Sequence, residues 1–190
     1  MAASDDFAFS TFFSLKKGYM YCEDVRIRTI QETLVSLVDQ PSPCVVYSES
    51  RIRENIGAYL EAVEKADIPC MLGYAIKANY NPAVLSVMKD KGCTAITVSG
   101  NEVKLALRAG FSPDHIVFNG NGKLLWEVQL AVLHGCIINV DSHYDLRHIA
   151  QEAKKQKKSV NVFLRVNPDI DSVSAYHRVF AYSQNVTLVC

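Results

Sequence analysis

The stretch MLGYAIKANYNP, residues 71–82, joins an apolar run to a polar cluster and then to the start of an amphipathic segment. The run Met71 to Ile76 has the length and composition of a buried strand, and Pro82 suits the first turn of a helix. The residues between them, Lys77 to Asn79, are mostly polar. A strand, a short polar turn and a helix make one βα unit, so this stretch predicts the pattern expected elsewhere in the chain.

The same order recurs before and after this stretch. The strand candidates are Pro43 to Tyr47, Met71 to Ile76, Ala95 to Val98, His115 to Phe118, Cys136 to Val140 and Val160 to Val166. Segments of helical period lie between them, at about Glu49 to Ala66, Pro82 to Lys91, Glu102 to Ala109, Leu124 to Leu133 and Tyr144 to Lys155. Gly92, Gly110 and Gly135 stand where three of these helices should end. This alternation indicates parallel strands connected by helices.

Polar clusters follow the strand candidates directly. They are Lys77 to Asn79, Ser99 to Glu102, Asn119 to Lys123, Asp141 to Ser142 and Asn167 to Asp169. In a (β/α)₈ barrel these turns would meet at the C-terminal rim, which carries the active site. The alternative is that they are ordinary turn and helix-cap residues. An open doubly wound sheet would alternate similarly, but it normally has a glycine fingerprint after its first strand. We therefore expect an α/β chain that forms an incomplete (β/α)₈ TIM-type barrel.

Composition narrows the class of protein. The 190 residues are 49% hydrophobic and 21% charged, with a formal net charge of zero, so no feature recruits nucleic acid or an anionic membrane. Six cysteines are spread singly, without a paired spacing or a cluster with histidine. This spacing favours reduced thiols over disulfides or a metal site and indicates an intracellular, soluble protein. The first residues make a poor signal or transit peptide.

Lys77 is the candidate for covalent chemistry. An ammonium at the end of a buried strand would have a lowered pKa, as a lysine that forms a Schiff base requires. The alternative, which burial alone favours, is a lysine whose charged end reaches solvent.

Several motifs, taken together in this order, resemble a known family. The stretch Tyr74 to Asn79 is similar to the YAxKAN cofactor-lysine motif of the alanine-racemase-type family of pyridoxal-phosphate-dependent decarboxylases. Further matches are the segments 98–102, 105–111, 118–123, 140–142 and 164–169. Within the family, these segments are most similar to the plant-type diaminopimelate decarboxylases, and the similarity runs from about Gly18 to Asp171.

The resemblance implies a function and a set of site residues. It implies pyridoxal 5'-phosphate as cofactor and decarboxylation of meso-2,6-diaminopimelate to L-lysine, by a homodimer in the full-length family, in the cytoplasm or the plastid stroma. It makes Lys77 the lysine that binds the cofactor, with Glu102 and Arg165 also lining the cofactor pocket. Ser99, Asn119, Asn121 and Lys123 become rim or substrate candidates. From the residues alone, Glu102 could be a helix N-terminal acid, and Asn121 and Lys123 could shape a loop.

Three regions follow from where the resemblance begins and ends. Residues 1–38 are expected to be an extension and a segment that packs on a C-terminal β-domain, residues 39–171 a partial cofactor-binding barrel, and residues 172–190 a tail without resemblance. The later family elements are not found, so we expect this chain alone to be inactive and its partial barrel to have exposed strand edges that favour aggregation. The alternatives are an ornithine or arginine decarboxylase relative and a non-catalytic binding homologue.

Overall fold

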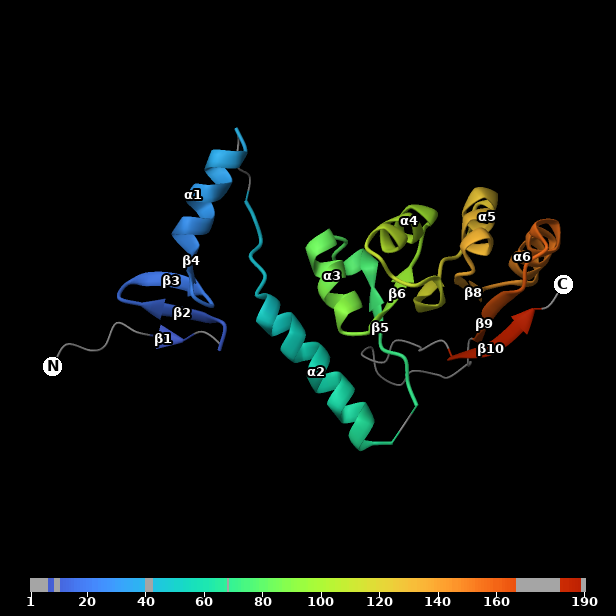
Figure 1. Cartoon of the computed structure of the whole chain (residues 1–190), viewed down its shortest axis with the longest axis horizontal. Helices are drawn as coiled ribbons and strands as arrows, with labels where there is room; N and C mark the ends of the chain where they lie inside the picture. Colours follow the sequence, from blue (N-terminus) through green and yellow to red (C-terminus); the bar gives the residue numbers. More distant parts are fainter. Residues whose placement is uncertain (1–6, 9–10, 40–42, 68, 167–181, 189–190) are drawn as a thin grey trace, which may run out of the picture. The chain divides into compact units, whose positions relative to one another are not determined.

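The protein was analysed as a computed structural model that describes residues 7–8, 11–39, 43–67, 69–166 and 182–188. The chain forms two compact units, Met1–Ile68 and Pro69–Cys190, each described here by itself (Figure 1). The division falls after the helix Glu49–Lys65, which lies inside the predicted barrel region, residues 39–171. The domain boundary expected after residue 38 stays a prediction.

The first unit contains a small antiparallel sheet and two helices. The strands β1 (Phe7–Ala8), β2 (Phe13–Lys16), β3 (Tyr19–Cys22) and β4 (Val25–Arg26) pair in that order, and the helices are α1 (Ile27–Leu37) and α2 (Glu49–Lys65). Lys17 and Gly18, both with positive φ (50° and 76°), form the two-residue turn between β2 and β3. Such a turn matches the twist of its strands. This sheet was not predicted from the sequence.

The strand predicted at Pro43 to Tyr47 is wrong. The segment is in no strand, and Val45 and Tyr47 expose 75% and 57% of their surface. A strand exists through hydrogen bonds to a neighbour, and no described strand pairs with these residues. The helix that follows agrees with its prediction, because Ser48 caps α2 by accepting a hydrogen bond from the Arg51 amide at 3.0 Å.

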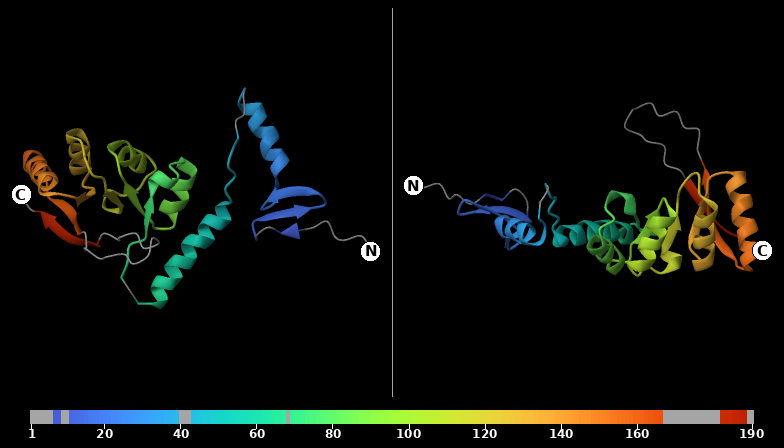
Figure 2. Two further views of the ribbon diagram at one scale, coloured as in Figure 1. Left: turned by 180° about the vertical axis from the view of Figure 1, so that it is seen from behind. Right: turned by 90° about the horizontal axis from the view of Figure 1, so that it is seen from above.

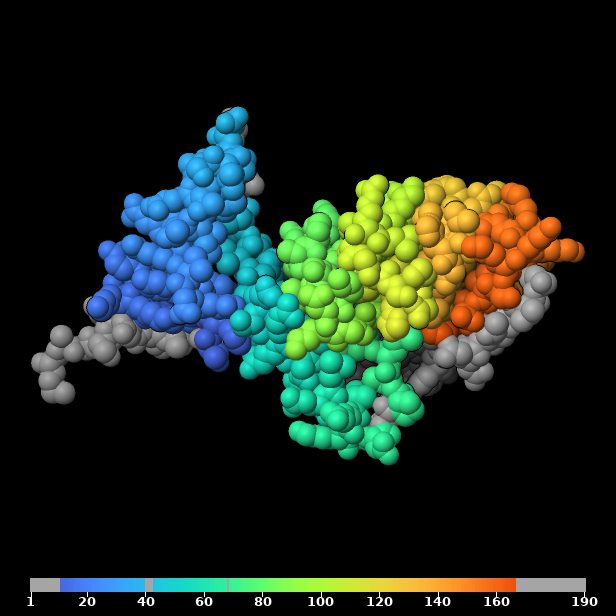
Figure 3. All heavy atoms as spheres, viewed as in Figure 1, coloured from blue at the N-terminus to red at the C-terminus, as the bar shows by residue number. Residues whose placement is uncertain are grey.

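The second unit is built on one six-stranded sheet. Its strands are β5 (Gly73–Ala75), β6 (Thr94–Thr97), β7 (Ile116–Phe118), β8 (Ile137–Val140), β9 (Val160–Val166) and β10 (Tyr182–Leu188). Strands β5 to β9 are parallel, and each pairs with the next along the chain. Strand β10 runs antiparallel along β9, from Tyr182 opposite Val166 to Leu188 opposite Val160. In Figure 3 the successive βα units form consecutive bands of colour, as this order requires.

The helices of this unit lie together on one face of the sheet. They are α3 (Pro82–Asp90), α4 (Gly100–Arg108), α5 (Leu125–His134) and α6 (His143–Gln156), with the 3₁₀ turns η1 (Ile76–Ala78) and η2 (Pro113–His115) beside β5 and β7. Figure 1 and the left view of Figure 2 show α3 to α6 along the same side of the strands. A doubly wound sheet carries helices on both faces and reverses its strand order. Helices on one face and strands in chain order are instead the arrangement of a TIM-type barrel, which confirms the predicted fold class.

The register separates the two faces of the sheet. Ala95, Ile116, Phe118 and Ile138 are aligned on the helix-covered face, and each is 0% exposed. This packed layer between sheet and helices is the core of the unit. The residues between them point to the opposite, concave face, including Asn139. A polar residue in the middle of a strand is unusual, and it leads to the candidate site.

Two further findings concern the cysteines and the lengths of the helices. Cys22, Cys44, Cys70, Cys93 and Cys136 are free thiols. Within the ranges described, no helix is both long and apolar enough to cross a membrane.

Candidate cofactor site at the strand ends

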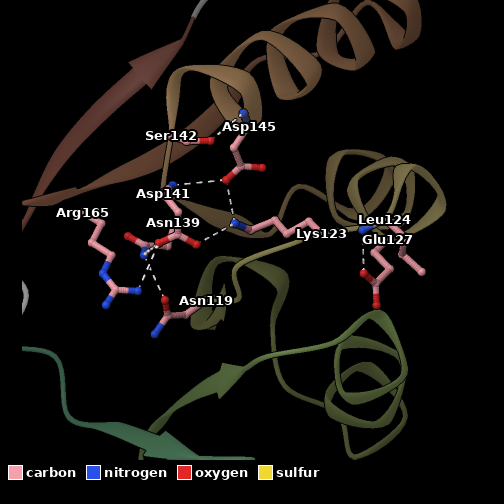
Figure 4. Close-up of polar contacts among 9 residues, drawn as sticks. All are labelled: Asn119, Lys123, Leu124, Glu127, Asn139, Asp141, Ser142, Asp145 and Arg165. Atoms are coloured by element: carbon pink, nitrogen blue, oxygen red, sulfur yellow. Dashed lines mark hydrogen bonds and ion pairs between the residues drawn. The ribbon is translucent and has the colours of Figure 1, made fainter.

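Polar side chains meet on the concave face where β7, β8 and β9 end (Figure 4). Asn139 Nδ2 donates a hydrogen bond to Asn119 Oδ1 at 2.9 Å and lies 3.5 Å from Asp141 Oδ1. On the other side of Asp141, Arg165 Nη1 lies 3.5 Å from the same carboxylate oxygen. Asn139 is only 6% exposed, whereas half of the Arg165 side chain is exposed. The row therefore runs from a buried amide to a cation at the surface of the sheet.

Lys123 lies behind this row and is almost completely buried. Its side chain is 1% exposed, and its ammonium lies 2.7 Å from Asp145 Oδ2 and 3.4 Å from Asp141 Oδ2. The amide of Asp141 also donates to Asp145 Oδ2 at 3.2 Å. Lys123 thus ties the loop after β7 to the first turn of α6. This geometry corresponds to the loop-shaping alternative for Lys123, and it makes Lys123 act on the rim through Asp141.

Ser99 and Glu102 form the N-terminal cap of α4. The hydroxyl of Ser99 accepts a hydrogen bond from the Glu102 amide at 3.3 Å, and the Glu102 carboxylate accepts one from the Val98 amide at 2.7 Å. A carboxylate in the first helical turn is also favoured by the helix dipole. Both residues lie at the rim. Their contacts cap the helix, so the role of Glu102 in lining the cofactor pocket stays a prediction.

The loop after β6 is held in place by a residue of α5. Glu127, 8% exposed, accepts hydrogen bonds from the amides of Gly100 at 2.6 Å and Leu124 at 2.8 Å. In the next turn, a Cβ on Gly120 would lie 2.7 Å from the Val98 carbonyl oxygen, so only glycine fits without a shift. These contacts fix two neighbouring rim loops against each other.

Lys77 stands at the carboxyl end of β5 and is exposed, which agrees with the alternative of a lysine whose charged end reaches solvent. The predicted strand 71–76 is shortened to Gly73–Ala75, Ile76 is buried at 0% exposure, and Lys77 is exposed in the turn η1. Among the described residues, Lys77 has no ion-pair or hydrogen-bond partner that would hold its amine.

The structure brings together some of the predicted residues and not others. Asn119 and Arg165 join one row, Ser99 and Glu102 cap α4, and Asn121 is exposed in the loop before α5. The predicted cluster Asn167 to Asp169 lies outside the described residues. Asn139, Asp145 and Glu127 were not predicted from the sequence. A polar residue at the third position of the apolar strand Ile137–Val140 was the available sign for Asn139.

Comparison with known families identifies the domain. Residues 49–184 match the family model described as the pyridoxal-binding domain of the pyridoxal-dependent decarboxylases. This chain belongs to that family. Similar curated proteins include a probable chloroplastic diaminopimelate decarboxylase of rice, 43% identical over 81% of this chain and 30% of the relative. A diaminopimelate decarboxylase of Archaeoglobus fulgidus is 35% identical over 84% of the chain and 36% of the relative.

Solved structures agree with this assignment. A diaminopimelate decarboxylase from M. jannaschii superposes with a TM-score of 0.77 at 29% identity, over 84% of this chain and 37% of that one. The Helicobacter pylori enzyme, solved in complex with L-lysine, superposes with a TM-score of 0.66 at 31% identity, over 76% of this chain and 36% of the other. The chain spans about a third of the length of the curated relatives it matches.

The residues at the rim fit the cofactor that the family binds. An exposed lysine amine at a strand end can condense with an aldehyde, and a half-exposed guanidinium is suited to an anionic group. Both stand at the carboxyl ends of parallel strands in one sheet, the edge at which such folds bind their ligands.

Proposed function

We propose that this chain supplies the cofactor-anchoring part of a decarboxylase that converts meso-2,6-diaminopimelate to L-lysine and carbon dioxide. The observation that carries the proposal is an exposed Lys77, without a partner among the described residues, in the motif Tyr74 to Asn79 at the rim. Two relatives that are 43% and 38% identical to this chain are named diaminopimelate decarboxylases, which favours this substrate over others of the family.

The proposed roles follow from where the side chains lie. Lys77 would bind the cofactor covalently, and Arg165 and Glu102 would line its pocket. Ser99, Asn119 and Asn121 are proposed to face the substrate side of the rim. Lys123 would contribute indirectly by holding Asp141, because its own ammonium is buried. When bound, pyridoxal phosphate accepts the electron pair left by the departing carboxylate.

The fold alone does not choose the substrate. An arginine decarboxylase from a Paramecium bursaria Chlorella virus superposes with a TM-score of 0.58 at 23% identity, which supports a shared fold. An ornithine or arginine decarboxylase relative is therefore the second candidate, and a non-catalytic binding homologue the third. As further parts of the proposal, the whole enzyme would be a homodimer and would work in the cytoplasm or in the plastid stroma, the latter suggested by the chloroplastic rice relative.

The proposal is tested by trapping the lysine. The purified chain is incubated with pyridoxal phosphate, reduced with borohydride, digested and mapped by mass spectrometry. We expect the pyridoxyl label to be concentrated on Lys77 and lost in Lys77→Arg. Exposed Lys65 serves as the internal reference for non-specific labelling. Equal labelling of Lys77 and Lys65 would contradict the proposed anchor.

Activity is the second measurement. We expect the 190-residue chain to release no carbon dioxide from meso-diaminopimelate, because it spans only about a third of its relatives. Turnover by this chain alone would refute that expectation. A full-length version assayed with diaminopimelate, ornithine and arginine would then decide between the substrates.

A further inference from the structure

Helix α5 is apolar on the side that faces solvent as well as on the side that faces the sheet. Val128, Ala131 and Val132 are buried, at 0–1% exposure, against the core. Trp126 and Leu133 point the other way and remain 39% and 54% exposed. A surface helix normally carries polar residues on its outer face, so an outer apolar row calls for an explanation.

A groove of about 630 Å³ runs along this outer row, on the helix-covered side of the unit. Its floor includes Trp126, Leu130 and Leu133 of α5, and its edges carry Lys104 of α4 and Lys155 and Lys158 beyond α5. The floor residues are spaced by four and three positions, so they form one row along the helix.

The lysines stand over the apolar floor. Lys104 Nζ lies 4.6 Å from the centre of the Trp126 ring, and Lys158 Nζ donates a hydrogen bond to the Leu133 carbonyl. The dipole of α6 explains lysines near the end of that helix, but not Lys104, which lies on another helix. The opposite edges of the groove are therefore both basic.

One carboxylate lies within this surface, and its charge is compensated. Glu152 is 5% exposed, accepts hydrogen bonds from Gln156 at 2.9 Å and Gln129 at 3.4 Å, and lies 3.8 Å from Lys155 Nζ. The Glu152 side chain lies between α5 and α6 and lines the groove there. The three ammonium groups at the edges thus outnumber the single buried carboxylate.

We propose that this groove binds an acidic amphipathic peptide segment of a partner protein. Apolar side chains of the segment, spaced by three or four residues, would cover Trp126, Leu130 and Leu133. Its flanking carboxylates would pair with Lys104 and Lys155. This is the helix-in-groove form of peptide recognition, and charge complementarity selects an acidic partner.

Two other occupants fit less well. A second copy of this chain placed on the groove about a twofold axis would bring the lysine edges toward one another, which is unfavourable. An anionic membrane would match the charge, but the apolar row is bordered by polar and charged side chains such as Lys104, Gln129 and Lys155, whereas membrane-binding helices present a wide apolar face. Both become outcomes of the test.

The single tryptophan of the chain lies in the groove and reports binding directly. The titrant is a tryptophan-free helical peptide with leucines at positions i, i+4 and i+7 and glutamates beside them. We expect a saturable blue shift of Trp126 fluorescence that weakens as salt is raised from about 0.05 to 0.5 M. A second peptide with lysines in place of the glutamates should bind at least about tenfold more weakly.

The control variants separate local contact from net charge. Lys104→Glu/Lys155→Glu should weaken binding of the acidic peptide by about tenfold or more. Lys65→Glu/Lys154→Glu changes the net charge equally at exposed lysines that do not line the groove, and it should leave the affinity within about twofold. Circular dichroism verifies that each variant is folded.

Other results would overturn the proposal. These are equal binding of both peptides, equal loss in both double variants, or no shift with the acidic peptide. A shift produced only by anionic phosphatidylserine vesicles would assign the groove to a membrane. A shift that grows with protein concentration alone, together with a dimer in sedimentation, would assign it to a second copy of the chain.

Discussion

Replacement of Lys123 by methionine should destabilise the second unit strongly while leaving its shape almost unchanged. Methionine retains the apolar stem and removes the ammonium that lies 2.7 Å from Asp145 and 3.4 Å from Asp141. Both carboxylates are only 13% exposed, so they would lose a partner without gaining much water. Removing one partner of a buried ion pair costs about 3–5 kcal/mol.

The expected cost lies at the lower end of that range. Asp145 would keep its hydrogen bond from the Asp141 amide at 3.2 Å, and Asp141 would keep Arg165 at 3.5 Å. We therefore expect a loss of about 3 kcal/mol in the free energy of unfolding of this unit. With a urea dependence of about 1.5–2 kcal/mol per M, the midpoint should fall by about 1.5–2 M.

Trp126 fluorescence during urea unfolding measures this loss for the second unit alone, because the chain has no other tryptophan. The matched control is Lys154→Met at an exposed position of α6, which should change the free energy by less than about 0.5 kcal/mol. The double variant Lys123→Met/Asp145→Asn should recover part of the loss because it removes one uncompensated charge. If Lys123→Met unfolds at the same midpoint as Lys154→Met, the buried ion pair does not hold the two loops together.

Three further outcomes are expected. Gly120→Ala places a Cβ 2.7 Å from the Val98 carbonyl oxygen and should cost about 1–3 kcal/mol in the same urea titration; an unchanged midpoint would mean that the loop yields freely. Burial raises the pKa of the Cys136 thiol to about 11, so iodoacetamide at pH 8 should label the exposed cysteines and leave Cys136 unlabelled until urea is added, as read by mass spectrometry. The hydrogen bond from the Ser48 hydroxyl holds the pKa of Glu23 below its ordinary value of 4.5, so its stabilising contribution is present above that pH and lost as the pH falls through the lowered pKa. The difference in melting temperature between the wild type and Glu23→Gln should therefore vanish in acid, and a difference that persists would contradict this cause.

The parallel strands of the second unit could be predicted from the sequence because their pattern is repeated. Each apolar run is followed by a polar turn and a helix, and every strand from β6 to β9 falls within two residues of its predicted bounds. The isolated run Pro43 to Tyr47 has similar composition but no neighbour to pair with in the described structure. The small sheet of the first unit lacked long apolar runs, and its tight turn Lys17-Gly18 was the sign available for it.

The candidate site was less predictable because its contacts depend on register and on distant partners. Lys123 meets Asp141 and Asp145 from 18 and 22 residues away, a pairing that no local pattern specifies. Asn139 reaches Asn119 only because β7 and β8 are aligned so that both side chains point to the concave face. The exposure of Lys77 depends on where β5 ends, and strand ends are poorly defined by composition.

The pairing of β10 with β9 moves one exposed strand edge without removing it. All seven residues of β9 face β10, so β10 becomes the margin of the sheet, and its outer edge pairs with no strand among the described residues. The other margin is β5, whose three residues offer a very short ladder to a foreign strand. A short margin is a poor template for intermolecular β-pairing, whereas a margin of seven residues is a better one. If the second unit joins other copies into fibrils, we therefore expect the contact to form along β10 and not along β5.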